Sequence, residues 1–241
     1  MNFKEEKFLN GKIKVFQPVK GYRFSLDSPI LAYFVEGSNS SVILDVGCGT
    51  GIISFILAKC KSYRKIIGID IIPEVLKYFK KGVEKNDFED RIISLFGDFK
   101  EPPFKDKAFD IVVSNPPYRD PLRGKVSPDK IKAIQTFELK LRFEELLKGV
   151  KKVLKEDGAF YTVIPEDRFN EFKGLCRKIG FYFDYVITVF HKKASKKPVF
   201  FILKLVKYKV FKKSYKIFLK DENSNEYTYF VESILRGERC L

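Results

Sequence analysis

The segment VILDVGCGTGI, residues 42–52, constrains the fold more than any other part of this chain. An apolar run that includes Asp45 is followed by a glycine-rich turn and then by an apolar helical stretch. Glycines at such a junction let the backbone turn tightly and approach a ligand that a Cβ atom would repel. A strand, a glycine-rich turn and a helix in this order are typical of the nucleotide-binding end of a doubly wound α/β sheet.

Apolar, β-branched runs alternate with amphipathic helical stretches through the middle of the chain, which indicates βαβ units. The pattern predicts five strands and then a closing antiparallel pair, at residues 42–46, 65–69, 91–96, 109–114, 159–164, 182–190 and 199–206. It predicts helices at residues 50–59, 73–85, 131–154 and 166–178. We therefore expect an α/β, Rossmann-like fold: a seven-stranded, mostly parallel sheet with the last strand antiparallel and helices on both faces.

The charge of the chain favours a polyanionic partner. Its 241 residues carry 46 Lys and Arg against 31 Asp and Glu, a net charge of +15. Nucleic acid and an anionic membrane surface are the two partners that such an excess suits. Eleven lysines and no acidic residue lie between Tyr185 and Lys220, interleaved with aromatic residues. A solubilising surface is the alternative interpretation of this stretch.

The cysteines and the apolar runs limit other classes of protein. Cys48, Cys60, Cys176 and Cys240 show no CxxC spacing, and His191 is the single histidine, so we expect no metal site and no disulfide framework. No apolar run is long enough to span a bilayer, and the charged start lacks the apolar stretch of a signal peptide. We expect a cytoplasmic protein with free buried thiols.

The glycine spacing resembles the first motif of class I methyltransferases. Gly47, Gly49 and Gly51 read GxGxG, whereas the dehydrogenase fingerprint is GxGxxG. The resemblance implies that S-adenosyl-L-methionine is the cofactor and S-adenosyl-L-homocysteine its product, with Asp45, Gly47, Cys48, Gly49 and Gly51 forming the cofactor loop. A plain strand-to-helix turn is the alternative for the glycines.

Two further strand ends carry acidic residues. Asp70 follows Gly51 by nineteen residues, where a carboxylate can accept hydrogen bonds from both hydroxyls of a ribose, and Ile71 comes next. Asp98 ends the third strand and resembles the acidic residue that meets the adenine amino group in this family, with Phe99 against the ring. Solvated carboxylates at strand ends are the alternative.

Asn115, Pro116, Pro117 and Tyr118 form the motif NPPY after the fourth strand, which we expect beside the first strand and so beside the cofactor. A conjugated amino group is a poor nucleophile because its lone pair is delocalised. Oδ1 of Asn115 and the carbonyl of Pro116 can accept its two N–H bonds and stabilise the positive charge that develops on nitrogen. The prolines stiffen the loop, and Tyr118 offers a flat face for an unstacked base. The motif predicts a planar amine as the acceptor, without separating adenine, cytosine and glutamine.

The order of GYRFSLDSPILAYF, DVGCGTG, NPPY, PEDRF and KKPVFFILKL resembles the tRNA1(Val) adenine N6-methyltransferases over nearly the whole chain. This resemblance implies N6-methylation of the adenine at tRNA position 37, just 3′ of the anticodon, in a valine tRNA. It also implies that FSLDSPIL lies against the methionine end of the cofactor, which makes Ser25 and Asp27 cofactor candidates. A helix N-cap at Ser28-Pro29 is the competing interpretation.

We divide the chain into a segment at 1–41 that covers the cofactor site, a methyltransferase core at 42–208, and a tail at 209–241 with a hairpin packed on the core. We expect a monomer that binds tRNA and no membrane. Basic residues in three places are candidates for RNA phosphates: Arg119, Arg123, Lys125 and Lys130 after NPPY, Arg168 after the fifth strand, and Lys192, Lys193, Lys196 and Lys197 between the last strands. We expect the first and third groups to flank the target.

Other substrates remain open from the sequence. A release-factor glutamine methyltransferase also uses NPPY, but residues 1–41 are short for the helical domain that those enzymes usually carry. Methylation of ribosomal RNA or DNA adenine is possible, although DNA enzymes would usually need an added recognition domain. A non-catalytic RNA-binding module is a distant alternative, because the motif residues are all intact.

Overall fold

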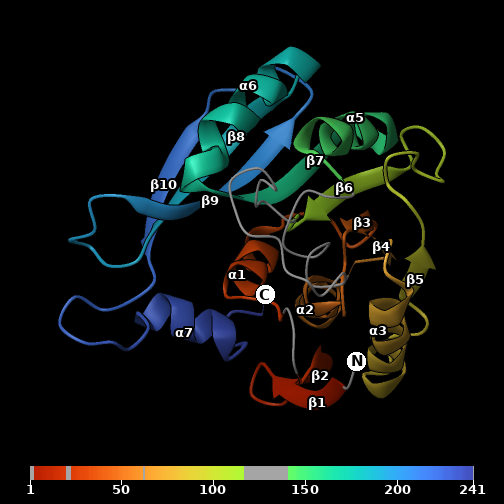
Figure 1. The fold of residues 1–241 in the computed structure, drawn as a ribbon, viewed down its shortest axis with the longest axis horizontal. Coiled ribbons are helices and arrows are strands. Elements are labelled where there is room, and N and C mark those ends of the chain that lie inside the picture. Colours follow the sequence, from red (N-terminus) through yellow and green to blue (C-terminus); the bar gives the residue numbers. More distant parts are fainter. Residues whose placement is uncertain (1–2, 20–22, 62, 117–140, 241) are drawn as a thin grey trace.

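A computed structural model describes residues 3–19, 23–61, 63–116 and 141–240. Its centre is an eight-stranded sheet (Figure 1), in the order β10-β8-β9-β7-β6-β3-β4-β5. The strands in that order are β10 (Lys213–Phe218), β8 (Tyr182–Phe190), β9 (Pro198–Val206), β7 (Leu154–Pro165), β6 (Phe109–Ser114), β3 (Val42–Val46), β4 (Lys65–Asp70) and β5 (Ile92–Phe96). Only β9 runs against its neighbours in this described sheet.

The predicted α/β architecture is confirmed, including the antiparallel direction of the last predicted strand, which is β9 and lies between β7 and β8. The predicted count of seven strands is wrong for this sheet, because β10 adds a parallel strand outside β8. The sequence of β10, KSYKIF, has no apolar run because the strand lies at the edge and most of its residues are exposed. Lysines on an edge strand also discourage pairing with another chain.

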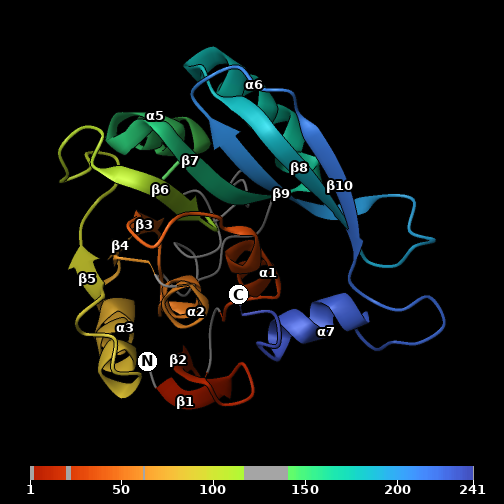
Figure 2. The same cartoon turned by 180° about the vertical axis from the view of Figure 1, so that it is seen from behind.

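Helices cover both faces of the sheet, as Figures 1 and 2 show from opposite sides. One face carries α1 (Asp27–Phe34), α2 (Ile52–Cys60) and α3 (Pro73–Lys85), and the other carries α5 (Phe143–Val153) and α6 (Phe169–Ile179), which follows a 3-10 turn at Glu166–Arg168. The central strands β3, β4 and β6 are mostly apolar because both of their faces are largely buried.

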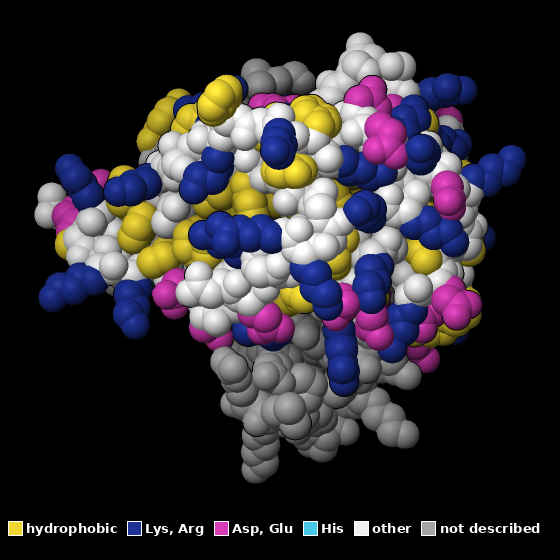
Figure 3. Space-filling model, turned by 90° about the horizontal axis from the view of Figure 1, so that it is seen from above, with side chains coloured by type: hydrophobic (Ala, Val, Ile, Leu, Met, Phe, Trp, Pro, Cys, Tyr) yellow, Lys and Arg dark blue, Asp and Glu magenta, His cyan; other side chains and the backbone are white. Residues whose placement is uncertain are grey.

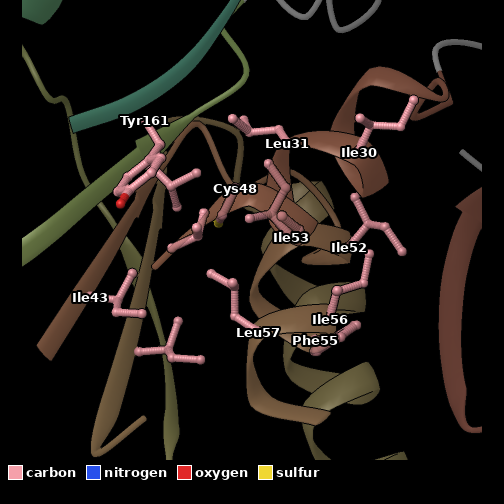
Figure 4. Close-up of a cluster of buried hydrophobic side chains, with 14 of the residues drawn as sticks. Ile30, Leu31, Ile43, Cys48, Ile52, Ile53, Phe55, Ile56, Leu57 and Tyr161 are labelled. Carbon is pink, nitrogen blue, oxygen red and sulfur yellow. The ribbon is translucent and has the colours of Figure 1, made fainter. Parts of the chain in front are cut away.

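The core on the α1 and α2 side is built from branched aliphatic residues. Figure 4 shows Leu31 of α1 and Ile53 and Leu57 of α2 on the side of the helices that faces the sheet, where Ile43 and Tyr161 lie. These side chains are almost fully buried, which stabilises each by roughly 1.5–3 kcal/mol relative to exposure. The sheet and α2 therefore hold the loop between β3 and α2 in a fixed place.

The predicted helix at 131–154 begins later in the part that the structure describes. Helix α5 starts at Phe143, and the carboxylate of Glu145 accepts the backbone N–H of Arg142 at 2.7 Å. This contact satisfies a donor at the helix start, as in a capping box. The predicted residues 131–140 lie outside the described residues.

The chain before β3 forms a hairpin and a helix. Strands β1 (Phe3–Phe8) and β2 (Ile13–Pro18) pair antiparallel and pack on α3, where the rings of Phe3 and Tyr78 stack with centroids 3.7 Å apart. Asn86 at the end of α3 accepts the N–H of Lys14 at 2.7 Å and donates to its carbonyl at 2.8 Å. The hairpin is thereby fixed to the core.

The chain after β10 returns to α1. A single antiparallel bridge joins Lys220 and Tyr227 around the turn, and helix α7 (Tyr229–Leu235) follows with Thr228 as its N-cap. Phe230 packs edge-on against Tyr33 of α1.

A disulfide joins Cys60, at the end of α2, to Cys240. The expectation of four free thiols is therefore wrong for this pair, whereas Cys48 and Cys176 are free and buried. Because 180 residues separate the bonded cysteines, only the tertiary structure brings them together. Among the described residues, no helix is long and apolar enough to cross a membrane, and no group of acidic, histidine or cysteine side chains is arranged to hold a metal ion.

Candidate active site

The motifs meet where three neighbouring parallel strands end. The glycine loop follows β3, Asp70 ends β4, and Asn115 follows β6. In the sheet register, Val46 of β3 lies opposite both Ile69 of β4 and Ser114 of β6, so the three ends are level. A ligand in a doubly wound sheet binds at such an edge.

The glycine loop is anchored to β4 and turns its open side toward a cavity. The N–H groups of Gly47 and Cys48 both donate to the carbonyl of Ile69, at 2.9 and 3.2 Å. Gly47 and Gly49 have φ angles of +70° and +54°, and a Cβ added to either would meet no atom within 4 Å. The space that their missing side chains leave is therefore available to a ligand.

Gly51 has a different role from the other two glycines. A Cβ at Gly51 would lie 2.2 Å from Cδ2 of Phe79, and its φ is +92°. This glycine lets the start of α2 pack against the aromatic ring of α3. Its place in the GxGxG motif is explained by packing rather than by contact with a ligand.

Asp70 faces the glycine loop. Its Oδ2 accepts the N–H of Gly49 and its Oδ1 accepts the N–H of Ile72, each at 2.9 Å, while burial raises the pKa of the carboxyl group. A carboxylate has about four acceptor positions, so Asp70 retains capacity for a donor such as a ribose hydroxyl. Ile71, next to it, is half-buried.

Asp45 is buried beneath the loop. Its Oδ2 accepts a hydrogen bond from Oγ of Ser54 at 2.7 Å, and burial raises the pKa of Asp45 to about 7. Among the described residues, two buried side-chain atoms have no hydrogen-bond partner: Oδ1 of Asp45 and Oε1 of Gln17. Gln17, unlike Asp45, lines the neighbouring cavity, so its unpaired Oε1 fits a ligand that carries amino or hydroxyl donors.

The cavity itself brings together several of the predicted residues and adds others. Its lining comprises Gln17, Pro18, Arg23, Phe24, Ser28, Gly47, Cys48, Gly49, Thr50, Ile52, Ile53 and Asn115. Gln17, Arg23 and Phe24 were not predicted, because their place depends on how the N-terminal hairpin packs. Thr50 was within reach of sequence analysis, since it lies inside the glycine motif.

Asn115 is held in place from two sides. Its Nδ2 donates to Oγ of Ser28 at 2.7 Å, and Ser28 is only 5% exposed. The preceding residue, Ser114, donates from Oγ to the carbonyl of Val46 at 2.9 Å. The first bond sets the orientation of the amide group, and the second holds the end of β6 beside the glycine loop.

The FSLDSPIL segment reaches the cavity through other residues than those predicted. Ser25 donates to Oδ1 of Asp27 at 2.5 Å, and the same oxygen accepts the N–H of Ser28 at 2.8 Å. Neither Ser25 nor Asp27 lines the cavity. The helix begins at Asp27, so the alternative of an N-cap at Ser28-Pro29 is wrong, and Ser28 is the residue of this segment that bonds to Asn115.

The side chains of Asp98 and Phe99 have different environments: the first is exposed and the second is buried. Asp98 is exposed after β5, where its Oδ1 accepts the N–H of Lys100 at 2.9 Å. Phe99 is 4% exposed and packs against Gly149 of α5, on the far face of the sheet from α1 and α2. The prediction that Phe99 lies against an adenine ring does not fit this position, because its ring belongs to the core.

Part of the predicted site lies outside the described residues. Pro116 is described and buried, whereas Pro117, Tyr118, Arg119, Arg123, Lys125 and Lys130 are not described.

The remaining basic candidates differ sharply in exposure. Arg168 is 4% exposed, and its guanidinium pairs with Glu171 at 2.9 Å and lies over the ring of Phe143 at 4.7 Å. This arrangement does not fit the predicted contact with RNA phosphate. Lys193, Lys196 and Lys197 are exposed on the loop after β8, and Lys192 is half-buried there.

The lysine loop faces the same edge of the sheet as the cavity. Strands β7 and β8 both run antiparallel to β9, so they run parallel to each other. Because β6 is parallel to β7, β6 and β8 also point the same way. The ends of β6 and β8 therefore lie at one edge. The loop is supported there by Glu222, whose carboxylate accepts the N–H of Ala194 at 3.1 Å.

Comparison with known proteins agrees with this arrangement. A protein-family profile described as "Methyltransferase domain" matches residues 38–213. The chain is 29% identical over 170 residues to a tRNA1(Val) (adenine(37)-N6)-methyltransferase from Dyadobacter fermentans, which covers 70% of each protein. A protein of the same name from Bacteroides thetaiotaomicron is 32% identical over 167 residues, 69% of each.

Solved structures share the fold. One titled as a predicted O-methyltransferase from Agrobacterium tumefaciens superposes with a TM-score of 0.68 at 15% identity and covers 88% of this chain and 96% of its own. At this identity the likeness concerns the fold alone.

Proposed function

This chain belongs to the methyltransferase-domain family and uses S-adenosylmethionine, and we propose that it methylates N6 of an adenine in tRNA, at position 37 beside the anticodon of a valine tRNA. The observation that carries the proposal is the bond between Asn115 and Ser28 in a cavity that the open glycine loop also lines. The names of the relatives supply the polymer and the position.

The residues around the cavity fit the cofactor. Gly47 and Gly49 leave room for it, Asp70 offers acceptors for its ribose hydroxyls, and Gln17 has a buried acceptor that lacks a partner. Asp98, exposed just after β5, is the residue that we assign to the adenine amino group. When bound, S-adenosylmethionine supplies an electrophilic methyl group on a sulfonium.

Asn115 and Pro116 prepare the amino group of the substrate. With Nδ2 turned toward Ser28, Oδ1 of Asn115 accepts one N–H of the adenine amine, and the carbonyl of Pro116 accepts the other. These acceptors favour a pyramidal nitrogen and stabilise the positive charge that grows on it. The second proton leaves to solvent after transfer, so no general base is required.

The charge of the carboxyl edge suits RNA. Lys193, Lys196 and Lys197 are exposed at this edge, where phosphates flanking the target base would lie. The target adenine must leave its stack, and a loop gives up a base at lower cost than a duplex. Arg168 is left out of this surface because its side chain is buried.

Two other acceptors fit the same chemistry: an adenine of ribosomal RNA and the side-chain amide of a release-factor glutamine. Both present a planar amine to Asn115. The relatives' names favour tRNA, and so does the net charge of +15 over a protein acceptor.

The deciding experiment is methyl transfer from labelled S-adenosylmethionine to total tRNA, followed by nucleoside analysis. We expect N6-methyladenosine in tRNA, mapping to position 37 of a valine tRNA. Asn115→Ala should abolish transfer and retain cofactor affinity. Labelling of ribosomal RNA or a release factor, with none in tRNA, would assign the substrate to an alternative.

A further inference from the structure

A second basic groove lies at the opposite edge of the sheet, where α6 ends and β8 begins. It has a volume of about 420 Å³ and is lined by Lys173, Arg177, Gly180, Phe181, Tyr182, Phe183, Val210 and Lys212. Three of these residues are cations, three are aromatic and none is acidic. The groove shares no residue with the active-site cavity.

The positive charge of this groove is not neutralised by ion pairs in the part of the chain that the structure describes. Among the residues that the structure describes, no carboxylate pairs with Lys173, Arg177 or Lys212. Their neighbours differ: Lys178 of α6 pairs with Glu144 at 3.4 Å, and Lys207 pairs with Glu156 at 3.6 Å. The groove therefore holds positive charge that an anion from outside can neutralise.

Exposed aromatic rings accompany the charge. Tyr182 lines the groove at 37% exposure, and Phe211, next to Lys212, is 98% exposed. Both rings are therefore open to contact from outside the protein. Unpaired cations beside exposed aromatic faces are the combination with which proteins hold the phosphates and unstacked bases of RNA.

The outer strands β8 and β10 run from this groove to the end of the sheet at which the active-site cavity lies. Strand β8 begins at Tyr182 in the groove and ends at Phe190, next to the loop of Lys192–Lys197, roughly 26 Å away at 3.3 Å per residue. Between them, β10 exposes Lys213, Tyr215 and Lys216 along the sheet edge. On the face seen from above in Figure 3, which carries α6, dark blue lysine and arginine side chains are interspersed with exposed apolar ones.

We propose that this groove binds the sugar-phosphate backbone of the substrate tRNA at a distance from the target base, so that the enzyme prefers folded tRNA to an isolated anticodon stem-loop. The proposal rests on the proposed function for the identity of the RNA. A polyanion that reached only the active-site edge would leave the groove empty, whereas a folded tRNA can follow β8 and β10 to both ends.

A structural role for the cations explains only part of the groove. Arg177 lies in the last turn of α6, where a cation stabilises the helix dipole, whereas Lys173 lies in the middle of that helix. Lys212 belongs to the segment before β10, and neither it nor the exposed ring of Tyr182 serves that helix.

The test compares two RNAs and two matched triple variants. The groove variant is Lys173→Ala, Arg177→Ala and Lys212→Ala. The control, Lys77→Ala, Lys80→Ala and Lys85→Ala, removes the same charge from exposed positions on α3. Equilibrium binding of a full-length valine tRNA and of its anticodon stem-loop is measured across a salt series, with cofactor binding and thermal unfolding as checks on the fold.

We expect the groove variant to raise Kd for full-length tRNA about tenfold and to lower the salt slope by about 2, with stem-loop affinity and the control unchanged. Equal Kd and slope for wild type and groove variant on tRNA would overturn the proposal, as would an equal loss on both RNAs. If the triple variant unfolds, the single variant Lys212→Glu replaces it, because Lys212 lies outside α6. It should also weaken the binding of full-length tRNA and leave the affinity for the stem-loop unchanged. Because binding is measured, a lack of methylated adenine would count against the proposed function and not against this groove.

Discussion

Nδ2 of Asn115 donates a 2.7 Å hydrogen bond to Oγ of Ser28, a residue 87 positions earlier in the chain. The two side chains come from opposite parts of the fold: Ser28 lies on α1, which precedes the glycine loop, and Asn115 follows the fourth strand of the core. The N-terminal segment therefore does more than cover the cavity. It orients the amide of the residue that we assign to the amine substrate.

Replacement of Ser28 by Ala should lower turnover more than binding. Loss of this one bond should raise the activation barrier by about 1–2 kcal/mol, because the amide is then less well oriented. This corresponds to roughly a tenfold fall in kcat. KM for RNA and the affinity for the cofactor should change by no more than about twofold. Steady-state kinetics on tRNA measures the split. Ser25→Ala is the matched control, because Ser25 is exposed and does not line the cavity, and it should leave kcat unchanged. A rise in KM with constant kcat would show that Ser28 only shapes the pocket.

Gly49 and Gly51 should respond in opposite ways to the same substitution. Gly49→Ala places a methyl group in open space on the cavity wall at a φ of +54°, so it should weaken cofactor binding at least tenfold and cost about 1 kcal/mol of stability. Gly51→Ala sets a Cβ 2.2 Å from the Phe79 ring and should cost about 3 kcal/mol or more. Calorimetric cofactor titration and urea unfolding separate the two effects. Equal loss of stability in both variants would contradict the distinction.

The pKa of Asp45 predicts a pH dependence of stability. Burial raises this pKa from 3.8 to about 7 in the folded protein, so the folded state holds the proton more tightly than the unfolded state. The stabilisation is complete below pH 4 and is lost as pH rises through 7. Asp45→Asn keeps an acceptor for Ser54 and removes the titration, so relative to wild type it should gain on the order of 2–4 kcal/mol between pH 4 and pH 8. Urea unfolding of both proteins at several pH values measures this difference, and a constant difference would refute the assignment.

The features that sequence analysis predicted correctly are local ones. The central strands at Val42–Val46 and Phe109–Ser114 have largely apolar runs because they are buried on both faces, and such runs are visible without a structure. Gly47, Gly49 and Asn115 also lie where expected, because each directly follows a strand whose position the pattern fixes.

The features that it missed depend on contacts between distant segments. Ser28 could not be chosen over Ser25 and Asp27 until the start of α1 was known. Phe99 follows an acidic strand end as expected, yet its ring turns into the core because Gly149 of α5 leaves room for it. Edge strand β10 has too few apolar residues to stand out, since one of its sides has no neighbouring strand.

The basic residues supply the last test, because burial separates two groups that look alike in the sequence. Lys193, Lys196 and Lys197 are exposed on the loop after β8. Changing all three to Ala should weaken tRNA binding about tenfold at moderate salt and reduce the salt slope by about 2–3. Because this loop lies on the active-site edge, the loss should also appear with the anticodon stem-loop.

Arg168→Ala should lower the stability of the protein and leave its binding of tRNA unchanged. It removes a guanidinium that pairs with Glu171 and lies over Phe143, so about 2–3 kcal/mol of stability should be lost while the salt slope for tRNA stays unchanged. Urea unfolding and salt-dependent binding of the two variants, measured side by side, check both halves. A reduced salt slope in the Arg168 variant would mean that the buried side chain turns outward to meet RNA, because a cation enclosed by Glu171 and Phe143 cannot release counterions from a phosphate.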